Sequence, residues 1–384
     1  MDYALTEEQV AIKDIAKKIA DSKIRPKAAE LDEKEEFPTE IIKVIAQSDL
    51  FGLYIPVEYG GFGGGCFELC LATEEFSKAC GGVAVCFAAS ALGAYPIVLY
   101  GSEEQKKKYL PDIAKGKKLA AFAITEPDAG SDAGSLKTSA SKTEGGYILQ
   151  GTKQWITNGG EAEIYTIIAM TDKTKGSRGA SCFILEKGMS GFEFGKKEKK
   201  LGIRCSATRE LIFKDCFVPA ENIIAREGMG FIVAMRTFDN SRPGIAAQAI
   251  GIAQGALDLA LKYANERVQF GQKISSFQGI QWMFADMATK IESARALTYA
   301  VCRMIDKGEK DVSMESAQAK LFASDTAMEV TTNCLQLFGG YGYMREYPIE
   351  KYMRDAKITQ IYEGTNQIQR NIIALKLIKE MAKQ

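Results

Sequence analysis

Glu363, in the segment IYEGT at residues 361–365, is the acidic residue whose neighbours most clearly suggest a chemical role. A carboxylate between apolar and aromatic neighbours is a candidate general base, because burial raises its pKa. A solvated acid that caps a helix has the same local sequence, and this segment alone favours that interpretation. The chain contains no histidine, which removes the commonest general base and metal ligand. Any chemistry must therefore use carboxylates, tyrosines, backbone amides or a bound cofactor.

Four further stretches carry side chains that could bind a ligand. Residues 123–132, AITEPDAGSD, offer hydroxyls and backbone amides at the end of a predicted strand. In the stretch WITNG at 155–159, Trp155 could cover a flat ring while Thr157 bonds its edge. The other two stretches are ERVQFG at 266–271 and LQLFGGYG at 335–342. Taken alone, the stretch at 123–132 is more typical of an ordinary turn, and Trp155 is more typical of a core tryptophan.

Composition excludes several classes of protein. The 384 residues are 46% hydrophobic, which predicts a large core and two or three domains. Lys plus Arg equals Asp plus Glu at 49 each, so nothing indicates binding to nucleic acid or an anionic membrane. We expect no membrane span, because no apolar run approaches the roughly 20 residues required. The acidic start, residues 1–8, does not resemble a signal or transit peptide, which favours a cytoplasmic location.

The nine cysteines are scattered through the chain, mostly in apolar surroundings. This pattern indicates reduced, buried thiols in a reducing compartment. Cys66 and Cys70 are four residues apart and could share a helix face, for which we favour core packing over a metal or redox role. We therefore predict no metal site.

The elements that must position these residues change twice along the chain. A capping box at Thr6 and Gln9 opens a helical region over 1–117. Residues 118–230 contain the strand candidates 147–150, 164–170 and 211–218, which indicate a β-barrel or sandwich. Residues 231–384 are helical again, and 245–260 predict a helix buried on all sides. The glycine-rich stretch 59–65 lacks phosphate-binding spacing and is a loop. The fold class is multi-domain α+β: an N-terminal helical domain, a central β-domain and a C-terminal helical bundle.

Together, ITEPDAGSD, WITNG, ERVQFG, LFGGYGY and IYEGTNQIQR, in this order, resemble the acyl-CoA dehydrogenase family over essentially the whole chain. The resemblance implies a homotetramer that binds FAD without a Rossmann fold. It implies that Glu363 removes the α-proton of an acyl-CoA thioester while the β-hydride passes to flavin N5. The implied electron acceptor is an electron-transfer flavoprotein.

The resemblance also assigns further site residues. It places the following residues at FAD: Thr125, Ser131, Trp155, Thr157, Arg267, Gln269, Phe270, Gln336, Gly340, Thr365 and Gln367. It places the following residues at the acyl-CoA: Ser131, Asp239, Arg242, Tyr362, Gly364, Val85 and Ala88. Of these, Arg267, Gln269, Phe270, Gln336 and Gly340 match positions that grip FAD across a subunit interface.

Positions at which members of the family differ from one another limit the range of expected substrates. Some members carry the base near position 241, where this chain has Ser241, so Glu363 keeps the common placement. Members that act on glutaryl-CoA carry an arginine near position 83, where this chain has Val83. Small apolar residues around Val85 and Ala88 suit a short linear, branched or alicyclic acyl group. An enoyl-CoA reductase that works in the reverse direction, or a non-catalytic relative, remains an alternative.

Overall fold

The computed structural model describes residues 3–383, and Met1 and Asp2 of the acidic start lie outside the described residues. The N-terminal third is helical: α1 (Glu7–Ile19), α2 (Ala28–Lys34), α3 (Thr39–Gln47), α4 (Cys66–Ala79), α5 (Gly81–Tyr100) and α6 (Glu103–Ala114). The predicted capping box is confirmed, because the Gln9 amide donates to Thr6 Oγ1 and the Gln9 side chain accepts from the Thr6 amide. The glycine-rich stretch is a loop that leads into α4.

The middle of the chain forms one mixed sheet: β1 (Ala120–Ala123), β2 (Ser139–Thr143), β3 (Gly146–Thr157), β4 (Ile164–Met170), β5 (Ala180–Glu186), β6 (Phe192–Lys197), β7 (Thr208–Pro219) and β8 (Ile223–Ile224). Its strand order is β6-β7-β3-β2-β4-β5-β8, with β1 parallel to β4. All seven residues of β4 are buried, as its continuous apolar run predicts. The three predicted strands are therefore confirmed within β3, β4 and β7.

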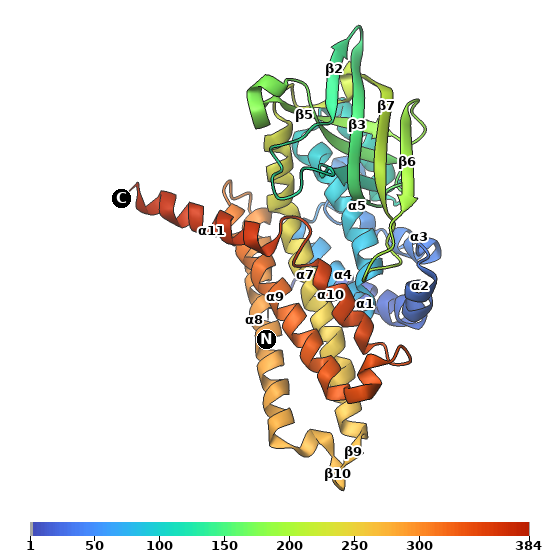
Figure 1. Ribbon diagram of the computed structural model, residues 1–384, viewed down its shortest axis with the longest axis vertical. Coiled ribbons are helices and arrows are strands. Elements are labelled where there is room, and N and C mark those ends of the chain that lie inside the picture. The colour runs from blue at the N-terminus through green and yellow to red at the C-terminus, as the bar shows by residue number, and fades with distance from the viewer. Residues whose placement is uncertain (1–2, 384) are drawn as a thin grey trace.

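The last third is a bundle of long helices, α7 (Gly230–Glu266), α8 (Gln278–Asp306), α9 (Ser313–Phe338), α10 (Ile349–Ile358) and α11 (Asn366–Met381). A short hairpin of β9 (Val268–Gln269) and β10 (Gln272–Lys273) joins α7 to α8. In Figure 1 the sheet lies at one end of the molecule, and α7 runs from it to the hairpin at the other end. The predicted order of helices, strands and helices is confirmed, whereas the division into domains at residues 117 and 230 stays a prediction.

Helix α7 forms the middle of the bundle. Residues 245–253 are buried without interruption, as predicted, but Asp258 faces solvent, so burial on all sides does not extend to residue 260. Helices α5 and α7 are long and apolar enough to cross a membrane, contrary to our expectation that no run approaches that length. Small residues between the larger apolar ones concealed this on inspection. In each helix, 78% of the most apolar 18-residue segment is buried inside the structure, as in a core helix.

Candidate functional site

Glu363 lies in the turn between α10 and α11, where α7 and α9 also meet. Ser241 of α7 donates a hydrogen bond from Oγ to Glu363 Oε2 at 2.5 Å, which leaves Oε1 for another partner. The two positions at which the resemblance allows a base, 241 and 363, are therefore in contact here. Glu363 has φ 51° and Gly364 has φ 93°, so two consecutive residues adopt the left-handed conformation. This conformation is uncommon for glutamate and indicates that the surroundings hold the turn in place.

The surroundings also set the charge of this carboxyl group. Loss of water contact raises the pKa of Glu363 to about 7, and the Ser241 hydrogen bond, Arg242 and Lys320 oppose the rise. The half-buried side chain is therefore not the freely solvated cap that its local sequence allowed. Thr365 caps α11 instead, accepting from the Ile368 amide. A carboxyl group that titrates near neutral pH suits a general base.

The predicted substrate residues Asp239 and Arg242 are buried and bonded to each other in α7. Arg242 Nε also donates to the backbone oxygen of Glu363 at 3.4 Å, and Asp239 Oδ2 accepts from Ser313 at 2.8 Å. Both residues thus support the turn that carries Glu363. Contact between them and an acyl-CoA stays a prediction.

The candidate flavin residues Thr125, Trp155 and Thr157 lie on neighbouring chain segments. The Gln154 amide donates to the Thr125 oxygen at 2.8 Å, which brings the end of β1 beside Trp155. Trp155 is 56% exposed with φ 58°, at an irregularity in the pairing of β3 with β7. It is therefore not a core tryptophan, and its ring is available to a flat ligand. Ser131 is exposed in the loop that follows β1.

This ring surface adjoins the Glu363 turn through aromatic contacts. Phe122 of β1 packs edge-on against Phe238 of α7, with ring centroids 5.5 Å apart. The Arg242 guanidinium lies 5.8 Å from the centroid of the Phe238 ring. Thr125 follows Phe122 by three residues, so the strand end and the carboxylate belong to one continuous region.

A buried ion pair that the sequence did not reveal supports the AITEPDAGSD loop. Lys153 Nζ donates to Glu126 Oε1 at 2.6 Å and to the Ile124 oxygen at 2.9 Å. The Glu126 carboxylate also accepts from the Lys137 and Thr138 amides. These bonds fix the backbone on either side of Thr125. Lys153 stands in a polar-looking stretch of β3, which concealed its burial.

A second group of predicted residues lies around a groove of about 470 Å³ at the hairpin end of α7. The lining includes four of the predicted cofactor residues, namely Arg267, Gln269, Gln336 and Gly340. Phe270 is 93% exposed at the tip of the hairpin. Arg267, which directly follows α7, comes 25 positions after Arg242, which corresponds to roughly 37 Å along the helix. Within one chain, the groove is therefore far from Glu363.

The remaining predicted residues lie around the turn or on α5. Tyr362 donates from its hydroxyl to the side chain of Gln248, which in turn donates to the Gly81 oxygen at the start of α5. Val85 is buried in α5 and Ala88 is half-buried. Gln367 is exposed in the first turn of α11. A hydrogen-bonded path therefore joins the Glu363 turn to the predicted floor of the acyl pocket.

Two polar residues at the site were missed from the sequence. Lys320 of α9 donates to the Gly364 oxygen at 2.8 Å, and Gln369 of α11 donates to the oxygens of Glu363 and Gly364. Lys320 occupies a position on the buried face of α9 that small residues otherwise fill, including Ala317, Ala323, Ser324 and Ala327. A lysine on such a face was the signal that could have identified it.

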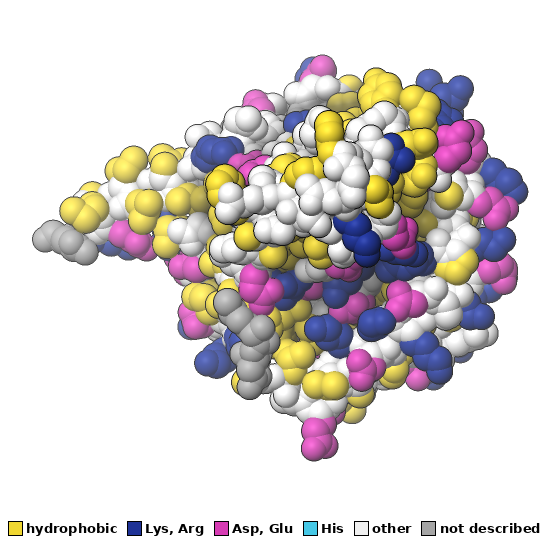
Figure 2. Space-filling view, turned by 90° about the horizontal axis from the view of Figure 1, so that it is seen from below, with side chains coloured by type: hydrophobic (Ala, Val, Ile, Leu, Met, Phe, Trp, Pro, Cys, Tyr) yellow, Lys and Arg dark blue, Asp and Glu magenta, His cyan; other side chains and the backbone are white. Residues whose placement is uncertain are grey.

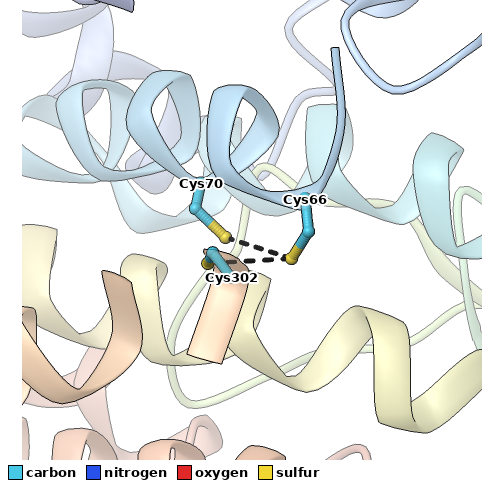
Figure 3. Close-up of side chains that lie close together, drawn as sticks. All are labelled: Cys66, Cys70 and Cys302. Carbon is cyan, nitrogen blue, oxygen red and sulfur yellow. Dashed lines mark hydrogen bonds between the residues drawn. The ribbon is translucent and has the colours of Figure 1, made fainter. Parts of the chain in front are cut away.

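All nine cysteines are free and buried, which confirms the predicted reduced thiols. Figure 3 shows Cys66 and Cys70 of α4 beside Cys302 of α8, with Cys66 Sγ 3.9 Å from Cys70 Sγ and 3.7 Å from Cys302 Sγ. The cluster is compact enough to hold a metal ion. Its surroundings raise the pKa of all three thiols well above the usual value, through contacts between the thiols and through burial. The preference for core packing over a metal or redox role at Cys66 and Cys70 stays a prediction.

Comparison with known proteins identifies the relatives of this fold. Three family models match the chain: the N-terminal domain of acyl-CoA dehydrogenase over residues 6–117, the middle domain over 121–216 and the C-terminal domain over 228–378. The chain belongs to the acyl-CoA dehydrogenase family. The acyl-CoA dehydrogenases are FAD-dependent oxidoreductases that act on CH–CH bonds, and solved relatives include FAD complexes.

Similar acyl-CoA dehydrogenases span the whole chain. A short-chain-specific acyl-CoA dehydrogenase of Clostridium acetobutylicum is 48% identical, with 99% of this chain and 100% of the relative covered. An NADH-dependent acryloyl-CoA reductase of Anaerotignum propionicum is 49% identical, with 99% and 96% covered. Butyryl-CoA dehydrogenase of Megasphaera elsdenii has a TM-score of 0.96 at 46% identity, with 98% and 100% covered. A chain from the structural study of the electron transferring flavoprotein of Acidaminococcus fermentans has a TM-score of 0.96 at 50% identity, with 98% and 99% covered.

The residues present fit FAD. A large aromatic side chain is held exposed at Trp155, between the hydroxyl-bearing Thr125 and Thr157. This donor set suits a flat, polar-edged ring system such as the isoalloxazine of FAD.

Proposed function

We propose that Glu363 is the base that removes the α-proton of a short-chain acyl-CoA as the thioester is oxidised to the trans-2-enoyl-CoA. The observation that carries this proposal is the placement of the Glu363 carboxyl group in a turn held by α7, α9 and α11, with Oε2 bonded to Ser241. Loss of water contact at this place raises the pKa of Glu363 to about 7. The short-chain assignment rests on the small apolar face of α5 and on the names of the relatives from C. acetobutylicum and M. elsdenii.

Each part of the site has a distinct task in this reaction. Bound FAD supplies the electron acceptor for the β-hydride. Thr125, Trp155 and Thr157 would hold its ring system, and Glu363 would take the α-proton on Oε1. Arg242 and Gln369 tie the backbone oxygens of the turn, which keeps the carboxylate aligned with the substrate.

Replacement of the base tests the proposal directly. Glu363→Gln keeps the size and hydrogen-bonding capacity of the side chain but removes its basicity. With butyryl-CoA as the probe, anaerobic flavin bleaching should slow by at least about 10²–10⁴-fold, the usual loss for a general base. The variant should still fold and retain FAD.

Glu309→Gln provides the control, because it removes an exposed carboxylate from the loop between α8 and α9. It should bleach at the wild-type rate. Bleaching of Glu363→Gln within ten-fold of that rate would contradict the assignment of the base.

The reverse reaction is a second candidate, since the relative from A. propionicum is named as an acryloyl-CoA reductase. The same carboxyl group would then deliver its proton to the α-carbon of an enoyl-CoA. The two directions can be separated by comparing butyryl-CoA oxidation with crotonyl-CoA reduction under matched acceptor and donor conditions. An electron-transfer flavoprotein is the proposed redox partner, which the likeness to the chain from the A. fermentans study supports.

We further propose that the FAD site is completed by a second copy within a homotetramer. The groove that holds Arg267 and Gln336 lies roughly 37 Å along α7 from the Glu363 region, too far to serve the same flavin within one chain. Figure 2 shows hydrophobic side chains along the projecting α11, where Leu375, Ile378 and Met381 are all more than 60% exposed. Exposed apolar surface of this kind is typical of a subunit interface. Sedimentation of the holoenzyme and the apoprotein should give a tetramer that weakens without FAD.

A further inference from the structure

We infer that Lys320 is a positioning residue whose hydrogen bonds fix the turn that carries Glu363, and whose positive charge favours the ionised form of the Glu363 carboxyl group. This inference rests on the proposed role of Glu363 as the base. Lys320 lies on α9, and its burial and hydrogen bonds provide the geometric basis of the inference.

Lys320 is fully buried, with 0% of the residue exposed. Its Nζ donates to the Gly364 oxygen and to Asn366 Oδ1, both at 2.8 Å. Both acceptors are neutral, and within residues 3–383 no carboxylate forms an ion pair with this ammonium. A buried charge without a direct counterion is costly, so a lysine kept at such a position requires an explanation.

The nearest explanation is the carboxyl group of Glu363 itself. Burial lowers the pKa of Lys320 to about 7, and among its charged neighbours Glu363 opposes that change most strongly. Reciprocally, Lys320 opposes the rise in the pKa of Glu363. The two groups therefore stabilise each other's charged forms although no hydrogen bond joins them directly.

Other charges around the turn are already paired. Arg242 of α7 also favours the Glu363 carboxylate, but it is bonded to Asp239. On α9, Asp325 accepts from Asn366 and from Arg370 of α11. On α10, Asp355 is bonded to Lys351. Lys320 thus faces Glu363 as the charge without a carboxylate partner of its own, in the part of the chain that the structure describes.

The same lysine restrains the geometry of the turn. The left-handed conformations of Glu363 and Gly364 direct the Gly364 oxygen toward α9, where Lys320 binds it. Asn366, at the start of α11, is held by Lys320 and by Ser324, whose Oγ lies 2.9 Å from Asn366 Nδ2. Ser324 therefore anchors the same segment as Lys320 but carries no charge.

Substitutions at Lys320 and Ser324 can distinguish the effect of the lysine charge from the effect of the hydrogen bonds that hold Asn366. In Lys320→Gln a neutral donor replaces the ammonium, so the pKa of Glu363 should rise. The acid limb of the pH profile for anaerobic flavin bleaching by butyryl-CoA should then move up by about 0.5–1 pH unit. In Ser324→Ala one neutral contact to Asn366 is lost, and the limb should stay at its wild-type position whatever happens to the rate.

Lys320→Arg provides a test if the neutral variant does not fold. Arginine stays charged at every accessible pH, so its acid limb should lie at or below the wild-type position. An unmoved limb in Lys320→Gln, an upward shift in Lys320→Arg, or equal shifts in Lys320→Gln and Ser324→Ala would overturn the inference. Failure of wild-type enzyme to bleach with any acyl-CoA, or full bleaching by Glu363→Gln, would instead refute the proposed function.

Discussion

Two buried lysines lie near opposite parts of the candidate site, Lys153 beside the loop that follows β1 and Lys320 beside the turn that carries Glu363. Lys153 forms a complete ion pair, with Glu126 Oε1 only 2.6 Å from its Nζ. Lys320 binds neutral oxygens and faces Glu363 without touching its carboxylate. The surroundings shift the two carboxyl groups in opposite directions, so that the pKa of Glu126 is lowered while that of Glu363 is raised to about 7.

The Lys153–Glu126 pair is suited to stabilising the fold, whereas the Glu363 carboxyl group, which Lys320 does not contact, is suited to proton transfer. Glu126 accepts from Lys153 and from two backbone amides, which favour its ionised form and make it a weaker base than Glu363. The Glu363 carboxylate accepts one hydrogen bond from a hydroxyl group, and only two more distant charges, Arg242 and Lys320, favour its ionised form. An incomplete pairing leaves the carboxyl group able to exchange a proton at neutral pH.

The largest expected effect is on stability at the complete pair. Lys153→Met leaves the Glu126 carboxylate buried without its cation, which should cost about 3–5 kcal/mol of unfolding free energy. Lys320→Met removes an ammonium that binds only neutral oxygens and should cost less, about 1–2 kcal/mol. Urea denaturation of the holoenzymes at pH 8 measures both changes. Because a paired apolar replacement often recovers the loss, Lys153→Met/Glu126→Leu should be more stable than Lys153→Met alone. Equal losses in the two single variants would remove the distinction between the sites.

The second effect is on activity as a function of pH. Glu363 accepts a proton only as the carboxylate, so kcat/KM should fall about ten-fold per pH unit below a pKa of about 7. Stopped-flow bleaching with butyryl-CoA between pH 5.5 and pH 8.5 would reveal this acid limb. A profile that stays flat down to pH 5.5 would show that the carboxyl group of the base is not raised. It would then resemble Glu126 rather than the proposed proton acceptor.

The smallest expected effect is an increase in the free energy of unfolding when Glu363 is replaced by a neutral residue. The folded-state pKa of Glu363 lies above the unfolded value of 4.5, so folding is penalised increasingly as pH rises from 4.5 through about 7. Glu363→Gln removes this penalty and should stabilise the holoenzyme by about 1–2 kcal/mol at pH 8. At pH 4.5 the same variant should differ little from wild type, which makes pH the internal control. Destabilisation at pH 8 would indicate that Glu363 is held like Glu126.

Much of the fold was predictable because its elements follow local rules. The continuous apolar run of β4 and the capping box of α1 were both read directly from residue types. The exposure of Trp155 was not, because it depends on an irregular pairing of β3 with β7 that forces a left-handed backbone. The sequence also did not predict that α5 is long and apolar enough to cross a membrane, because small residues interrupt its larger apolar side chains.

The sequence by itself determined the family and the order of helices and strands and predicted the proposed base, since each was read from residues that stand near one another in the chain. The tertiary structure alone decided the charge state of that base. Ser241, Lys320 and Gln369 reach the turn at Glu363 and Gly364 from three different helices, and their separations in sequence carry no sign of that contact. A pKa is set by the distance to charges and by the exclusion of water, which exist only after α7, α9 and α11 have packed together.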